Sequence, residues 1–260
     1  MDQVDASAAG SATPLDDVRQ EALRLAQEAM RRDLPVRLLG GTAVWVRSPS
    51  AKLPGLSRTY GDVDVISLRS ARHQITRFFE AMGYVPDELF NAIHGAQRLN
   101  FMDPAHNRPL DVLLDRFVMC HTLDLRRRLT LEPLTIPLPD LLLTKLQVVR
   151  INEKDIRDLV VLVADHPVTG PSGEALDLKR LSSVLGRDWG FEHTVRANLA
   201  RLRESLDDYD VPAEMRTRVV ERVDAIVAAL NQGKKTIGWR ARGIVGERFR
   251  WYELPEDVNH

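Results

Sequence analysis

The sequence predicts an α/β fold: a small mixed sheet with flanking helices, followed by a helical C-terminal domain. Short apolar runs bounded by turn residues alternate with segments of helical periodicity as far as about residue 164, and beyond residue 173 only the helical period continues. A length of 260 residues suits one large or two small domains. We expect a disordered N-terminus over 1–12, a sheet-containing domain over 13–166 and a helical domain over 174–260.

Helices and strands should alternate in the N-terminal part. Thr13 and Pro14 are the expected N-cap and first residue of a helix that ends near Arg32, because the apolar residues between them recur at helical spacing. Apolar runs predict strands over 34–39, 60–66, 97–101, 110–114 and 131–136. Helical spacing predicts helices over 42–46, 71–82, 137–150 and 152–164.

The C-terminal part should be a small helical bundle. Two prolines and two glycines between residues 166 and 173 indicate the boundary. Helical spacing then predicts helices over 176–185, 191–206 and 212–230. The tail over 234–252 is basic with interleaved aromatic residues, so it either contacts the phosphates and bases of a nucleic acid or packs on the helical domain.

A glycine pair followed by two aspartates is the main functional signal. Gly40, Gly41 and Thr42 end an apolar run, and such a turn lets the backbone approach a phosphate and point N–H groups at it. Asp62 and Asp64 alternate with valines, so in a strand both carboxylates project from one face. Paired carboxylates of this kind suit Mg²⁺ together with substrate phosphates. The pattern predicts a site for a nucleoside triphosphate and its metal ion.

A third acid lies inside a later apolar run. Asp111 interrupts the predicted strand over 110–114, where a carboxylate is costly unless it is paired or bound to a metal ion. We expect this strand to lie beside the strand of Asp62 and Asp64. Asp111 is then a candidate third metal ligand.

These motifs resemble the nucleotidyltransferase fold, in which a glycine turn, an Asp-x-Asp strand and a third strand aspartate form a two-metal site. Lys145 on one helix and the run Lys154-Asp155-Ile156-Arg157-Asp158 on the next are similar to the AbiEii (type IV abortive-infection) toxins, including the MenT-type toxins. The resemblance covers roughly residues 34 to 165. The chain departs from the family at Thr59, one place away from the usual threonine, and at Thr42, where many relatives have serine.

The resemblance implies a role for each residue. Two Mg²⁺ ions, or Mn²⁺ in their place, would be held by Asp62, Asp64 and Asp111, and the nucleoside triphosphate (NTP) is the substrate. Lys145 and Arg58 would contact the triphosphate, with the glycine turn. Asp155 would act as general base or anchor, and the sequence leaves open whether Asp155 or Asp158 has that role. The acceptor would be a tRNA 3′ end, and the protein would be a toxin with an antitoxin partner.

Two alternatives remain open. The acceptor is a small molecule of the aminoglycoside kind or a protein hydroxyl, or the fold is catalytically silent and only binds nucleotide, RNA or a partner. Other site classes find no support: the seven histidines show no zinc spacing, and neither a P-loop lysine nor a Gly-x-Ser-x-Gly motif occurs.

Composition agrees with a cytoplasmic enzyme. The net charge is −1, so the chain as a whole is not a basic nucleic-acid binder, although a local basic groove is compatible with it. The single cysteine, Cys120, fits a reducing compartment. The acidic N-terminus predicts no signal peptide, and no apolar run approaches the ~20 residues that a membrane span needs.

Overall fold

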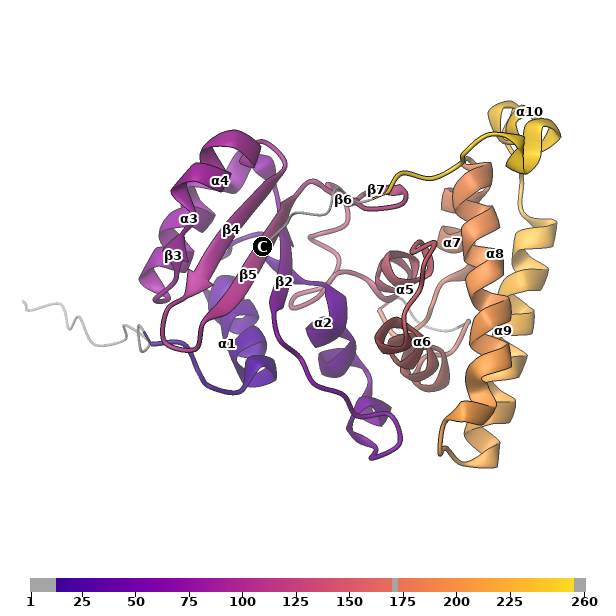
Figure 1. Ribbon diagram of the computed structural model, residues 1–260, viewed down its shortest axis with the longest axis horizontal. Helices are drawn as coiled ribbons and strands as arrows, with labels where there is room; N and C mark the ends of the chain where they lie inside the picture. Colours follow the sequence, from indigo (N-terminus) through magenta and orange to yellow (C-terminus); the bar gives the residue numbers. More distant parts are fainter. Residues whose placement is uncertain (1–12, 170–172, 255–260) are drawn as a thin grey trace, which may run out of the picture.

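The computed structural model describes residues 13–169 and 173–254 and has a mixed α/β architecture (Figure 1). Its main sheet has five strands in the order β1-β2-β5-β4-β3, and β6 and β7 form a separate two-stranded sheet. The strands are β1 (Arg37–Leu38), β2 (Val63–Ser67), β3 (Val85–Pro86), β4 (Arg98–Asp103), β5 (Arg108–Leu114), β6 (Arg116–Val118) and β7 (Thr122–Asp124).

The register of the central strands aligns polar residues across the sheet. Strands β2 and β5 are parallel, and Asp64 lies opposite Asp111. Strands β4 and β5 form an antiparallel hairpin in which Asn100 lies opposite Asp111. Side chains alternate between the two faces of a strand, so Leu110 and Val112 enter the core while Asp111 faces the other side. The three residues Asp64, Asp111 and Asn100 therefore form one row across the sheet.

Helices pack against the apolar face of this sheet. They are α1 (Val18–Arg31) and α3 (Arg72–Ala81), each with one buried apolar stripe, and the Phe79 ring of α3 lies 5.2 Å from that of Phe101 on β4. The short helix α4 (Glu88–His94) is attached to β4, because the Asn91 side chain accepts from Asn100 N at 2.7 Å and donates to Asn100 O at 3.0 Å.

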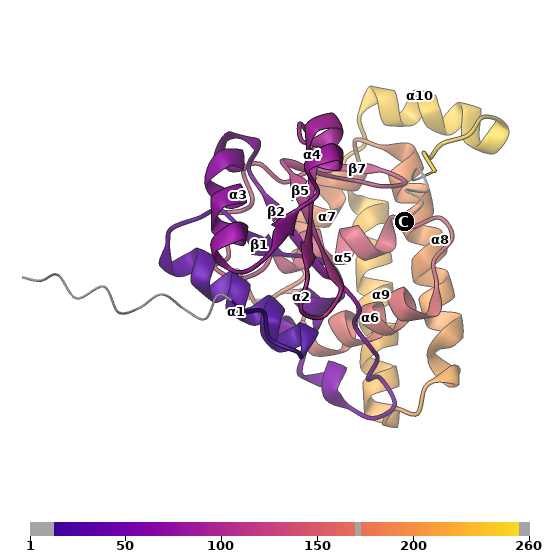
Figure 2. The ribbon, with the colours of Figure 1, turned by 60° about the vertical axis from the view of Figure 1, so that its left-hand side comes forward.

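The remaining helices lie together on the side of the molecule opposite α3 (Figures 1 and 2). Helix α2 (Gly40–Arg47) contacts β2 as well as α5 and α6, and α5 and α6 in turn contact the helices that follow. These helices are α5 (Leu138–Leu146), α6 (Glu153–Asp165), α7 (Leu178–Leu185), α8 (Trp189–Glu204), α9 (Ala213–Gln232) and α10 (Ile237–Val245). Short 3₁₀ helices are η1 (Pro49–Lys52), η2 (Arg69–Ala71), η3 (Ser205–Asp208) and η4 (Gly246–Arg248).

Several element boundaries differ from the sequence-based expectation. Helix α1 begins at Val18 and not at Pro14, because the Asp17 carboxylate caps it by accepting from the N–H groups of Arg19 and Gln20. Residues 131–136 form no strand in the described chain. Instead Leu38 N donates to Leu134 O at 2.9 Å, and Ile136 N donates to Leu38 O at 3.0 Å.

Two further differences concern short or terminal elements. Strand β2 begins at Val63, so Asp62 directly precedes the strand. The expected strand over 34–39 is reduced to Arg37–Leu38, while α4 and α10 were not expected. The expected disordered segment 1–12 lies outside the described residues. None of the described helices is both long and apolar enough to cross a membrane.

Candidate active site

Three carboxylates gather where β2 begins beside β5. Asp64 and Asp111 are opposed in the parallel pair, and Asp62 lies two residues before Asp64 on the same segment. Both Asp64 and Asp111 are half-buried, whereas Asp62 is exposed. We call Asp62, Asp64 and Asp111 the acid row.

Negative charge in the acid row is incompletely balanced. Burial of Asp64 raises the pKa of its carboxyl group, and the like charges of Asp62 and Asp111 raise it further, to about 7 from an ordinary value of 3.8. Lys145 and Arg98 act in the opposite direction but do not offset these effects. A carboxyl group in this condition is stabilised in its charged form by any cation that binds beside it.

The glycine turn packs directly on the acid row. Gly40 adopts φ +66°, a left-handed conformation that favours glycine, and a Cβ at this position would overlap Asp64 Oδ2. The Leu39 amide donates to Asp64 O at 3.1 Å and fixes the turn to β2. Only glycine, which has no Cβ, allows the start of α2 to lie this close to the Asp64 carboxylate.

The start of α2 has the properties of an anion site. The helix begins at Gly40, so the three residues Gly40, Gly41 and Thr42 form its first turn, where the sequence predicted a turn before a shorter helix. Its N-cap, Leu39, offers no side-chain hydrogen bond to the N–H groups of this turn. Within residues 13–169 and 173–254, the buried Thr42 Oγ1 also has no hydrogen-bond partner. Uncapped N–H groups at a helix start attract anions such as phosphate.

An ion-pair network lies next to this turn. Arg58 donates to both oxygens of Asp158, Nε to Oδ1 at 2.9 Å and Nη2 to Oδ2 at 2.8 Å. Lys145 Nζ lies 2.8 Å from Asp158 Oδ2 and 2.8 Å from Asp155 Oδ1. We call Arg58, Lys145, Asp155 and Asp158 the ion-pair network; it joins the loop before β2 to α5 and α6.

Charges within the ion-pair network are balanced. Burial would lower the pKa of Lys145, but Asp158 and Asp155 outweigh burial and raise it. Burial would likewise raise the pKa of Asp158, but Lys145 and then Arg58 hold it below its ordinary value. Lys145 is 9% exposed, so it is not a surface side chain that merely covers apolar area. Arg58, Lys145 and Asp158 are therefore charged at neutral pH.

Arg58 links the network to the glycine turn. A Cβ at Gly41 would overlap Arg58 Nη2, so the guanidinium lies against the backbone of the first turn of α2. The same guanidinium lies 4.3 Å from the centre of the Tyr60 ring. Arg58 is therefore held at the predicted phosphate turn by Asp158 and by stacking on Tyr60.

Arg98 and Asn100 join the site without having been predicted. Arg98 Nε donates to Asp111 Oδ1 at 2.6 Å, and the Asn100 amide reaches the same oxygen at 3.1 Å when its nitrogen faces the carboxylate. Residues 98 and 100 share a face of β4. Counting residues outward from the turn over 103–108 places Asn100 opposite Asp111, so the predicted hairpin was sufficient to identify Asn100 as a neighbour of Asp111.

The donor chemistry fits a divalent cation at Asp62 and Asp64. No group of three or more His, Cys, Asp or Glu side chains in the described part of the chain is arranged to hold a metal ion. Asp111 Oδ1 is ion-paired with Arg98 Nε at 2.6 Å. Mg²⁺ is commonly held by one or two carboxylates together with substrate phosphates, and the first two acids satisfy that requirement.

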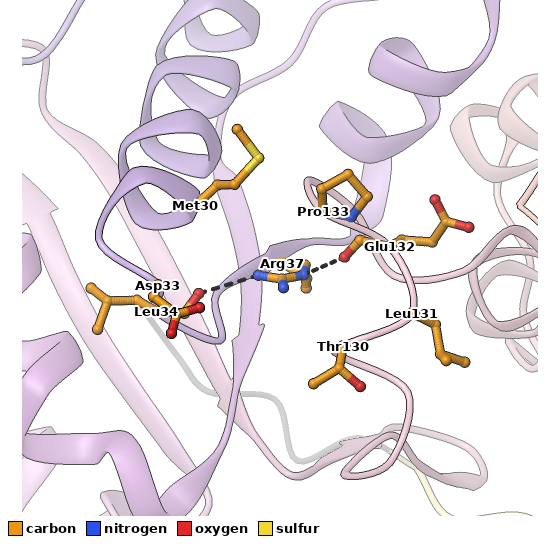
Figure 3. Close-up of a pocket in the computed structure, with 8 residues that line it drawn as sticks. All are labelled: Met30, Asp33, Leu34, Arg37, Thr130, Leu131, Glu132 and Pro133. Carbon is orange, nitrogen blue, oxygen red and sulfur yellow. Dashed lines mark hydrogen bonds between the residues drawn. The ribbon is translucent and has the colours of Figure 1, made fainter.

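Two cavities in the described part of the chain lie away from the acid row. One, of about 240 Å³, lies between the end of α1, β1 and residues 130–133 (Figure 3). There Arg37 Nη1 donates to Leu34 O at 3.2 Å, and Arg37 Nε donates to Glu132 O. The Arg37 guanidinium joins the loop of residues 130–133 to β1. None of the residues that line this cavity belongs to the candidate active site. A second cavity lies beside α10.

The structure brings the nine predicted site residues into one continuous region. Contacts or strand pairing join Gly40 to Asp64, Asp64 to Asp111 and Gly41 to Arg58. Asp158 then joins Arg58 to Lys145, and Lys145 pairs with Asp155. Neither models of known protein families nor curated proteins give a match for this chain.

Proposed function

We propose that this protein is a metal-dependent nucleotidyltransferase that moves a nucleoside monophosphate from an NTP to an acceptor hydroxyl. The observation that carries the proposal is the acid row, whose excess negative charge lies against a glycine turn that starts an uncapped helix. A divalent cation would balance the acid row, and a triphosphate would accept hydrogen bonds from the start of the uncapped helix. Strongly perturbed carboxyl groups cluster at catalytic sites, which favours an enzyme over a silent binding module.

Asp62 and Asp64 would hold the metal ion, and Asp111 would join them when Arg98 turns away. Bound Mg²⁺ or Mn²⁺ would stabilise charge on the transferred phosphoryl group and lower the pKa of the acceptor hydroxyl. Two ions remain the expectation by analogy with the nucleotidyltransferase fold. Ionised Asp64 is the form that binds, so the metal has to displace the proton that this carboxyl group retains near neutral pH.

The first turn of α2 would bind the β- and γ-phosphates. Its N–H groups and the unpartnered Thr42 hydroxyl are donors, and the Arg58 guanidinium is already fixed at Gly41. Lys145 lies close enough to Asp64 to favour its charged form, so its positive charge also acts on the metal and phosphate region. Asp155 is ion-paired with Lys145, and we assign it a positioning role in place of a general base.

The proposed step breaks one bond and forms one. The acceptor oxygen attacks the α-phosphorus, the bond from that phosphorus to the α,β-bridging oxygen breaks, and pyrophosphate leaves with the bonding electron pair. The hydroxyl proton passes to solvent water. Preorganised charge from Arg58 and Lys145 would stabilise the negative charge that develops on the leaving pyrophosphate.

The acceptor is the finer part of the proposal. The resemblance to AbiEii-type toxins supports a tRNA 3′ end as the acceptor and an antitoxin as the partner. A small-molecule hydroxyl is the alternative, and the same experiment separates them.

The test is transfer of label from each of the four NTPs carrying ³²P at the α-position. The protein is incubated with Mg²⁺ and with total RNA, a panel of aminoglycosides, or no added acceptor. We expect label in one acceptor class from α-labelled NTP, none from γ-labelled NTP, and none with an Asp64→Asn variant. Labelling that persists in Asp64→Asn, or release of γ-phosphate without transfer, would show that the proposal is wrong.

A further inference from the structure

A cavity in the helical part of the molecule lies apart from the acid row. It has a volume of about 420 Å³ and is bounded by α8, the end of α9 and the start of α10, on the opposite side of the molecule from α3 (Figure 1). This volume falls in the range of about 300–1,000 Å³ that is usual for small-molecule sites. We call it the α8/α10 groove. None of its lining residues belongs to the candidate active site.

The walls of the α8/α10 groove are aromatic and fixed in position. Trp189 stacks on His193 with ring centres 4.8 Å apart and an angle of 12° between the planes. Trp239 comes from α10, whose start is capped by the Thr236 hydroxyl, and its Nε1 donates to Glu192 Oε2 at 3.1 Å. Rings that are already held in place lose little conformational entropy when a flat ligand stacks on them.

Positive charge surrounds these rings. Glu192 is only 2% exposed and is ion-paired with Arg196 at 2.8 Å and also with Lys235, so two cations surround one buried carboxylate. Residues 234–250 contain six Lys or Arg and one Glu, whereas the whole chain has a net charge of −1. Arg240, which follows Trp239 in the chain, and Arg248 are exposed residues of this basic segment. A ligand of this groove should therefore combine a planar ring with negative charge.

We propose that the α8/α10 groove binds unpaired nucleotides of a single-stranded nucleic acid. An unpaired base offers the flat ring, and the flanking phosphates offer the charge that the basic residues attract. A base inside a duplex is already stacked between its neighbours and is not available to stack on these rings. The inference goes beyond the transfer reaction, because it concerns binding without NTP or metal.

The test measures binding of a fluorescein-labelled 12-nucleotide RNA to the full chain by anisotropy, in EDTA and at several salt concentrations. The same sequence as single-stranded DNA, the matching RNA duplex and AMP as competitor complete the set. We expect the single-stranded RNA to bind at least about tenfold more tightly than the duplex, with affinity falling steeply as salt rises. The DNA arm separates an RNA-specific groove from a general single-strand groove. If AMP at the same concentration as the RNA displaced half of the bound RNA, the groove would be a site for free nucleotides and the proposal would be overturned.

Variants at Trp239 locate the binding site. Trp239→Ala should weaken single-strand binding by about tenfold, the typical effect of losing one stacking ring, while Trp239→Phe keeps a ring and should stay within about threefold of wild type. Arg240→Glu should flatten the salt dependence. Arg203→Ala is the matched control, because Arg203 lies on the same helix α8 but pairs with Asp224 and does not line the groove.

Three outcomes would contradict the proposal, provided that circular dichroism shows every variant to be folded. The first is equal affinity for duplex and single strand. The second is wild-type binding by Trp239→Ala. The third is loss of binding in Ile244→Asp but not in Trp239→Ala, which would place the ligand on the outer face of α10, where Ile244 is 84% exposed.

Discussion

The acid row and the ion-pair network lie side by side and treat charge in opposite ways. In the network, Arg58 and Lys145 are matched by Asp155 and Asp158 at distances of 2.8–2.9 Å, and Arg58, Lys145 and Asp158 stay in their charged forms. In the acid row, like charges and burial leave Asp64 with a pKa of about 7. The ion-pair network balances its own charges, whereas the acid row has the excess negative charge that the proposed cation would offset.

The difference assigns separate roles to neighbouring acids of the same kind. Asp158 is 2% exposed and satisfied by two cations, so removing it should damage the fold. Burial and the neighbouring acids destabilise the charged form of Asp64, so replacing it should spare the fold and reduce only the proposed transfer activity. The predictions below test this separation, beginning with the largest expected effect.

The largest effect should come from Asp64→Asn. Loss of the carboxylate removes the metal, whose stabilisation of transition-state charge is worth several kcal/mol, so nucleotide transfer should fall by about a thousandfold or more. The measurement is the initial rate of label transfer from α-labelled NTP. Asp207→Asn is the control, because the Asp207 side chain is 91% exposed, and it should transfer at the wild-type rate. A rate for Asp64→Asn within a few-fold of wild type would remove Asp64 from the site.

Asp158→Ala should destabilise the fold. It leaves Arg58 and Lys145 as buried cations without their shared partner, which costs about 3–5 kcal/mol of unfolding free energy. Urea denaturation followed by circular dichroism measures this loss. The double variant Asp158→Leu with Lys145→Met should recover part of it, because the buried charge and its partner are removed together. If Asp158→Ala unfolds at the wild-type urea concentration, the network is not structural.

Stability of the metal-free protein should depend on pH through Asp64. Its pKa is about 7 in the folded state, above the 3.8 of the unfolded chain, so the folded state binds more protons between these values. The contribution of Asp64 to the free energy of unfolding should therefore be largest below about pH 4 and should fall as the pH rises to 7. We expect a fall of about 2 kcal/mol, which is less than the full pKa shift implies because the side chain is partly exposed to solvent.

The control for this pH dependence is Asp64→Asn, compared with wild type by urea denaturation in EDTA. The difference in unfolding free energy between the two proteins isolates the titration of Asp64 from that of other groups. Asp64→Asn should become relatively more stable than wild type from pH 4 to pH 8. A difference that stays constant over this interval would mean that Asp64 titrates normally.

Arg98→Ala should give the smallest effect. It frees Asp111 from its ion pair, so the acid row gains negative charge and should bind Mn²⁺ a few-fold more tightly, by about 0.5–1 kcal/mol. Titration calorimetry measures the change. Arg116→Ala, at an exposed arginine on β6, is the control and should bind Mn²⁺ like wild type. Weaker binding by Arg98→Ala would indicate that Arg98 positions Asp111 as a ligand.

Local patterns were sufficient to predict much of the fold. Apolar runs around a turn placed β4 and β5, and apolar spacing placed α3, α6, α7, α8 and α9 within a few residues of their observed ends. The mixed α/β class with helices in the C-terminal part is confirmed. The metal, the activity, the acceptor and the division into two domains stay predictions.

Other features depend on contacts that a sequence does not display. In place of the strand predicted over 131–136, Thr135 makes an isolated bridge with Leu38 at the end of the two-residue strand β1. Helix α10 was not predicted within the basic-aromatic tail, because it depends on the Thr236 cap and on the hydrogen bond from Trp239 to Glu192, 47 residues away. At the site, the sequence indicated the candidate acids. Only the structure shows that Asp158 is paired with two cations, whereas Asp64 lies among like charges.

The central claim is that the acid row awaits a divalent cation together with a triphosphate. Its most direct test is Mn²⁺ binding followed by electron paramagnetic resonance, without and with a non-hydrolysable NTP analogue, in wild type, Asp64→Asn and Asp158→Asn. We predict weak binding by wild type alone, binding at least tenfold tighter with the analogue, and loss of both in Asp64→Asn while folded Asp158→Asn retains the metal. Equal Mn²⁺ binding by wild type and Asp64→Asn, or no effect of the analogue, would contradict the account.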